Sequence, residues 1–256
     1  MMKKLYKWDL IHFFNQLKWV FLGTLFVTAL AAIFKTFSDT NIIWGSLYNT
    51  AFIMSIAGII IGLVYSFFAI FQRYYNTILK DEAYFTHTLP ISKGKILLSK
   101  VLSGFSLFLI AILVAAALLI WIDVINLKEL FSLQSIDQGL FWMTILSISS
   151  MVIMFFVFIV VIYAALTFGF SYNKREWLYV FVYFILYYMA NQFLSLINFG
   201  INLLINPNLL DVENTEVFAA LSGILIIQLI CSIGLGVLNF YIARILMIKK
   251  LNLKNG

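Results

Sequence analysis

The chain has 256 residues, of which 63% are hydrophobic and only 11% charged, and its mean hydropathy is +1.01. Such values lie far outside the soluble range and predict an integral membrane protein. The formal net charge is +6, but the basic residues are spread over several segments, so membrane topology explains them better than nucleic-acid binding does. The single cysteine, Cys231, excludes an internal disulfide and a metal cluster built on cysteines.

Residues 1–18 are too charged to cross a bilayer. They predict an amphipathic interfacial helix on the cytoplasmic side, with Leu10, Phe13 and Leu17 on its apolar face. A signal peptide is the competing interpretation, because Ala29-Leu30-Ala31 has the pattern of a cleavage site. The long charged N-terminal region, which contains Asp9, and the further apolar runs argue against it. Residues 19–256 are assigned to one transmembrane domain.

Six apolar stretches in that domain have the length needed to cross the hydrocarbon core, about 20 residues. They predict spans at about 19–37, 51–71, 101–122, 140–170, 177–205 and 217–243. The second span contains Gly58 and Gly62 in GxxxG spacing, which lets another helix approach closely and predicts helix packing.

Charge orients these spans. With six crossings, every Lys and Arg except Lys35 and Lys128 falls in a segment on one side, and the positive-inside rule makes that side cytoplasmic. Both termini are then cytoplasmic. The predicted fold class is an all-α membrane protein with six transmembrane helices and an interfacial N-terminal helix.

The longest polar interruption, residues 72–100, lies on the cytoplasmic side. Residues 78–88 have few helix breakers, Leu89-Pro90 should stop a helix, and Ser92 can cap the next one. The pattern predicts a short helix across the membrane face. It offers charged and aromatic side chains to a soluble partner, although a helix resting on lipid headgroups has a similar composition.

This loop also carries a resemblance. The run Lys80-Asp81-Glu82, then 88–93 (TLPISK), then Lys100 at the start of a span, resembles the membrane subunits of type-2 ABC exporters, such as small bacterial peptide or drug exporter permeases. The resemblance implies that the loop is a coupling helix in a cleft of a separate ATP-binding-cassette ATPase subunit, and that a second copy or a homologous permease completes a dimer. The expected ATPase-coupling residues are Asp81, Glu82, Tyr84, Phe85, His87, Leu89 and Pro90.

Several kinds of chemistry have no motif in this chain. No GxxxxGK[ST] occurs, so ATP and Mg are expected in the partner ATPase, and no HExxH or GxSxG occurs. The histidines, His12 and His87, are predicted outside the hydrocarbon, and no metal site is expected. Because ionisable residues are scarce deep in the spans, an ion-coupled secondary transporter is the less favoured alternative. We expect a non-catalytic subunit.

The fifth span carries a polar stripe whose members recur at helical spacing. One interpretation is hydrogen bonding between helices; the other is the wall of a translocation path. In the resembled exporters the first and fifth spans form the dimer interface around that path, so the two can coincide. The stripe consists of Asn191, Ser195, Asn198, Asn202 and Asn206.

The expected function is that of the permease half of an ATP-driven exporter. A path with few charges suits an amphipathic or hydrophobic substrate: a peptide such as a toxin or antimicrobial peptide, a lipid or an apolar drug. The rich use of Ile, Asn, Lys and Phe is typical of an AT-rich bacterial genome, which suggests a bacterial plasma membrane. A membrane scaffold or sensor subunit is the alternative from another class.

Overall fold

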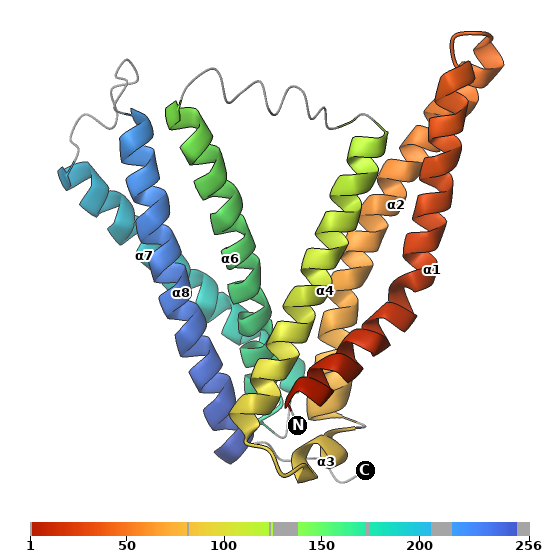
Figure 1. Cartoon of the computed structure of the whole chain (residues 1–256). Coiled ribbons are helices and arrows are strands. Elements are labelled where there is room, and N and C mark those ends of the chain that lie inside the picture. The colour runs from red at the N-terminus through yellow and green to blue at the C-terminus, as the bar shows by residue number, and fades with distance from the viewer. Residues whose placement is uncertain are drawn as a thin grey trace. The chain divides into compact units, whose positions relative to one another are not determined.

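The structure is a computed structural model, and it describes residues 2–80, 82–122, 124, 138–172, 175–205 and 217–249. All regular structure in these ranges is helical (Figure 1). The elements are α1 (Met2–Phe37), α2 (Ile42–Tyr74), the π-helix η1 (Tyr75–Leu79), α3 (Ala83–Thr88), α4 (Lys93–Trp121), α6 (Gln138–Gly169), α7 (Glu176–Ile205) and α8 (Val217–Lys249).

Within the described ranges, six helices are long and apolar enough to cross a membrane: α1, α2 continued by η1, α4, α6, α7 and α8. Each predicted span falls on one of them, so the prediction of an all-helical chain with six candidate spans is confirmed. The helices extend beyond the apolar runs: α2 begins at Ile42 and α4 at Lys93. A helix does not have to end where the hydrocarbon ends, because its backbone hydrogen bonds are internal.

Helix α1 joins the predicted interfacial segment and the first predicted span without a break. Figure 1 shows that it bends, with its N-terminal part running at an angle to the rest. Its buried residues recur at helical spacing, which marks one face toward the protein. They are Asp9, Phe13, Leu17, Thr24, Thr28 and Ala31. The charges of the first 18 residues therefore interrupt the hydropathy but not the helix.

The chain forms two compact units. Residues 1–74 and 98–130 make the first unit, in which α1 packs along α2. The close approach occurs at Gly58, where a Cβ atom would lie 3.2 Å from Thr24 Cγ2, and at Gly62, where it would lie 3.5 Å from Phe21 Cε1. A core cluster around Ile59, Ala115 and Leu118 joins α2 to α4.

Residues 75–97 and 131–256 make the second unit. Here α6 packs along α8, and α7 packs against both. Small residues allow the contacts: a Cβ atom on Gly236 would lie 3.0 Å from Val157 Cγ2, and one on Gly169 would clash with Val180 Cγ2. The second half of α6 is its buried part, from Ile159 to Thr167. The loop with η1 and α3 also belongs to this unit.

Candidate functional site

The loop between α2 and α4 is built from short helical pieces. The π-helix η1 continues α2, α3 follows from Ala83 to Thr88, and Leu89 adopts an extended conformation (φ −60°, ψ 136°) before Pro90. The new helix α4 then starts at Lys93, where the backbone amide of Ile96 donates to the Ser92 carbonyl at 3.2 Å. The short helix ends before Leu89-Pro90, where the sequence places its end. The predicted helix over 78–88 is divided, because η1 ends at Leu79 and α3 begins at Ala83.

His87 fastens α3 to both neighbouring pieces. One ring nitrogen, Nε2, lies 3.1 Å from the Ile78 carbonyl oxygen of η1, and Lys93 Nζ lies 2.9 Å from Nδ1 and 2.8 Å from the His87 carbonyl oxygen. Lysine nitrogen donates only, so Nδ1 accepts and Nε2 carries the proton. Burial lowers the pKa of His87; the Ile78 hydrogen bond raises it and the nearby Lys93 charge lowers it. The sequence assigned His87 to partner docking, whereas its ring is engaged within the loop.

Three aromatic rings hold the start of the loop. The Tyr75 ring lies 5.3 Å from the Phe170 ring and 5.9 Å from the Trp177 ring, and the latter two are 5.7 Å apart. These are favourable aromatic distances. Lys80 Nζ lies over the Tyr75 ring, 5.8 Å from its centre. The cluster ties η1 to the ends of α6 and α7 that face each other across their connection.

Close packing holds the far end of the loop. A Cβ atom on Gly94, in the first turn of α4, would lie 3.2 Å from Arg244 Cδ and Nε near the end of α8. Glycine therefore allows α4 to start directly against that side chain. The loop contacts the rest of the second unit at both ends, and it is an ordered element of the fold.

The outer surface of α3 carries exposed aromatic side chains. Tyr84 is 69% exposed and Phe85 73%, with their ring centres 6.0 Å apart, while Ala83 and Thr86 on the same helix are buried. Glu82, Leu89 and Pro90 are exposed beside them. Asp81 lies outside the described residues. Of the predicted coupling residues, these five form one exposed surface, which we call the α3 surface, and His87 lies behind it.

The helices that flank the loop meet at one buried carboxylate in the first unit. Asp9 of α1 is 1% exposed; its Oδ1 atom accepts from Arg73 Nε of α2 at 2.9 Å and from Lys100 Nζ of α4 at 2.8 Å. Its Oδ2 atom is buried and has no hydrogen-bond partner among the described residues. Two weaker contacts run alongside: Gln16 Nε2 to Gln72 Oε1 at 3.4 Å, and the Tyr6 hydroxyl to Ser106 Oγ at 2.8 Å.

Sequence reasoning missed this cluster. It used Asp9 only as a charge of the N-terminal region, Arg73 only as a basic residue of the loop, and Lys100 only to orient the loop and as part of the resemblance. A signal was present, because Asp9 precedes Phe13 and Leu17 by four and eight residues and so shares their buried face. Its partners lie 64 and 91 residues away in the chain, and no local pattern identifies them.

The polar residues of the stripe on α7 differ in burial and in hydrogen bonding. Asn198 is 2% exposed and donates to the Ile224 carbonyl oxygen of α8 at 3.0 Å, and Asn202 donates to Asn198 Oδ1 at 2.8 Å. Asn191 and Ser195 are half-buried, and Asn206 lies outside the described residues. Within this chain, Asn198 links α7 to α8, and Asn202 bonds to Asn198 of its own helix. Hydrogen bonding between helices is thus observed at Asn198, and the translocation path stays a prediction.

Among the described residues, no three His, Cys, Asp or Glu side chains come together in a way that could hold a metal ion. Comparisons with protein-family models, with curated proteins and with solved structures find no match for the chain. The fold therefore defines a class: a helical protein with six candidate membrane spans. A function can be proposed only from the loop between α2 and α4.

Proposed function

We propose that the chain is the permease subunit of an ATP-binding-cassette exporter, which moves an amphipathic or hydrophobic substrate, foremost a peptide, out of a bacterial cell. The observation that carries the proposal is the α3 surface. Two large aromatic side chains stand exposed on a six-residue helix that His87, the Tyr75 ring cluster and Gly94 hold in place. Preorganised aromatic residues are the kind that anchor protein interfaces, because little conformational entropy is lost on binding.

The sequence is the basis for placing ATP binding in another subunit. With no phosphate-binding loop of its own, the chain takes its energy from a separate ATPase subunit, which binds ATP and Mg. The proposed α3 surface receives that subunit on the predicted cytoplasmic side. A second permease, either a copy or a homologue, completes the transporter in the membrane.

The proposal is tested by purifying the chain from its native membrane in mild detergent and identifying what accompanies it. An ATP-binding subunit should be recovered with the wild-type chain. The double variant Tyr84→Ala/Phe85→Ala should reduce that recovery at least about 10-fold, because interface anchors often contribute about 2 kcal/mol or more each. Insertion and yield should not change, since both side chains are exposed.

Phe14→Ala is the matched control. Phe14 is 71% exposed on the N-terminal part of α1, so it tests whether any exposed aromatic residue on that side matters. Its recovery of the ATPase should equal that of the wild type. If the double variant keeps the ATPase as well, the α3 surface is not the docking site. A chain that purifies alone, without ATPase activity, would favour the scaffold or sensor class.

A further inference from the structure

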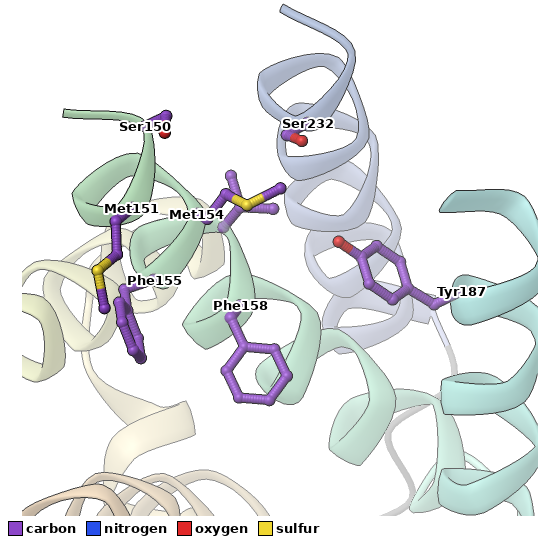
Figure 2. A pocket seen from close by; sticks show the side chains of 8 residues that line it. Ser150, Met151, Met154, Phe155, Phe158, Tyr187 and Ser232 are labelled. Carbon is purple, nitrogen blue, oxygen red and sulfur yellow. The ribbon is translucent and has the colours of Figure 1, made fainter. Parts of the chain in front are cut away.

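A pocket of about 430 Å³ lies in the second unit among α6, α7 and α8 (Figure 2). Its volume is within the range of small-molecule sites, roughly 300–1,000 Å³. The wall is mainly methionine and aromatic side chains with three hydroxyl groups. It consists of Ser150, Met151, Met154, Phe155, Val157, Phe158, Tyr187 and Ser232.

The walls of this pocket are held by contacts around it. Val157 of α6 packs directly against Gly236 of α8. One turn of α7 before Tyr187, the Tyr183 hydroxyl donates to Asn239 Oδ1 of α8, and farther along α7 Asn198 bonds to the Ile224 carbonyl oxygen. Helices α7 and α8 are thus fastened on both sides of Tyr187, so the pocket is part of the packed fold and needs no rearrangement to form.

The Tyr187 hydroxyl is the feature that points to a ligand. In Figure 2 the side chain extends from α7 toward α6 and α8, with the hydroxyl leading. It makes no hydrogen bond to any residue that the structure describes, whereas the Ser150 and Ser232 hydroxyls donate to carbonyl oxygens of their own helices, at 2.8 Å in both cases. Tyr187 lies about 17 Å along α7 from Glu176, near the middle of a hydrocarbon core about 30 Å thick.

A hydroxyl at that depth without a partner is costly, because no water is present to satisfy it. We propose that the pocket binds an uncharged ligand with an apolar body, whose one hydrogen-bonding group meets the Tyr187 hydroxyl. None of the described residues that line the pocket is charged, which disfavours an ionised ligand. A phospholipid is a poor match, since its polar groups lie at the membrane surface.

The role of this ligand rests on the proposed function: it would be a substrate, or the apolar part of one, on its way across the membrane. The binding itself does not depend on the ATPase. It is measured on the full chain alone in nanodiscs of phosphatidylethanolamine and phosphatidylglycerol. Failure to recover an ATPase with the wild-type chain would therefore overturn the exporter and leave the binding site to be judged separately.

The probe is a long-chain alcohol that carries a photoactivatable diazirine, with attachment sites mapped by mass spectrometry. We expect saturable labelling of Met151, Met154 and Tyr187 that the unmodified alcohol competes away. Tyr187→Phe keeps the ring and removes the hydroxyl, so the half-saturating concentration should rise about 3- to 10-fold, the usual effect of one hydrogen bond. Met154→Trp should abolish saturable labelling by filling the pocket.

Met189→Trp is the matched control. Met189 is 62% exposed on α7 and lies outside the pocket, so the same substitution there should leave binding unchanged. Phe193, 65% exposed on the same helix, reports labelling from the lipid, which should rise linearly with probe concentration. If the pocket residues label as linearly as Phe193, or if Tyr187→Phe binds like the wild type, the proposed site is wrong.

Discussion

The two units bury polar side chains in different ways. The first unit buries a charge: Asp9, with Arg73 and Lys100, at the ends of three helices. The second unit buries neutral amides well inside its spans, among them Asn198 and Asn239, each hydrogen-bonded to a neighbouring helix.

The difference follows from the cost of desolvation. Transferring an ion from water into an apolar interior costs far more than transferring an amide, so buried ions need close partners and favour positions near the membrane surface. Asp9, Arg73 and Lys100 all lie within two or three turns of a helix end, on the predicted cytoplasmic side. Neutral amides can sit deeper, because carbonyl and hydroxyl groups of the helices around them serve as hydrogen-bond partners. Charge therefore joins helices near their ends in the first unit, and amides join helices well inside the candidate spans of the second unit.

The largest expected effect comes from Asp9→Asn. The substitution removes the carboxylate that Arg73 and Lys100 share while keeping the size of the side chain, and breaking a buried ion pair in this way costs about 3 kcal/mol or more. The apparent melting temperature of the purified chain should fall clearly. Asp39→Asn is the control, since Asp39 is exposed beyond the other end of α1 and should have almost no effect.

The double variant Asp9→Asn/Lys100→Met restores the net charge of the cluster without restoring the link from α1 to α4. It should regain part of the lost stability, because the less exposed of the two cations is gone. A double variant no more stable than Asp9→Asn would mean that the cost comes from the missing link and not from uncompensated charge.

A smaller effect is expected for Asn198→Leu. The substitution removes the hydrogen bond to the Ile224 carbonyl oxygen and the acceptor of Asn202, and such contacts between membrane helices contribute about 0.6 to 2 kcal/mol. Thermal unfolding should detect a loss below that of Asp9→Asn. Asn191→Leu, at a half-buried position of the same stripe, should cost less. An equal loss for Asn198→Leu and Asp9→Asn would contradict the difference between charge and amide.

Features that depend on a local stretch of sequence could be predicted, whereas contacts between residues far apart in the chain could not. The six spans are long apolar runs, and the end of α3 follows from the steric effect of Pro90, so local patterns suffice for both. The burial of Asp9 depends on partners 64 and 91 residues away, and hydropathy counts an aspartate as polar wherever it lies. The pocket beside Tyr187 is a gap left by the packing of three helices, which no single-segment pattern encodes.

The smallest expected effect is on the stability of the loop, which depends on the neutral imidazole of His87 in the second unit. Its Nδ1 atom accepts from Lys93 only while the imidazole is neutral, and burial lowers its pKa in the folded loop below the ordinary value of 6.5. Between the folded and the ordinary pKa the unfolded loop binds more protons, so the loop loses stability as the pH falls from about 6.5. Hydrogen exchange of the α3 amides, corrected for intrinsic rates, should show less protection at about pH 5 than at pH 7.

His87→Gln should remove most of that dependence on pH, because glutamine does not titrate. His12→Gln is the control: His12 is exposed on α1, and its substitution should leave the exchange of α3 unchanged at either pH. Protection of α3 that is the same at both values in the wild type would mean that the contact between His87 and Lys93 does not hold the loop. The support for the α3 surface would then rest on the Tyr75 ring cluster and Gly94.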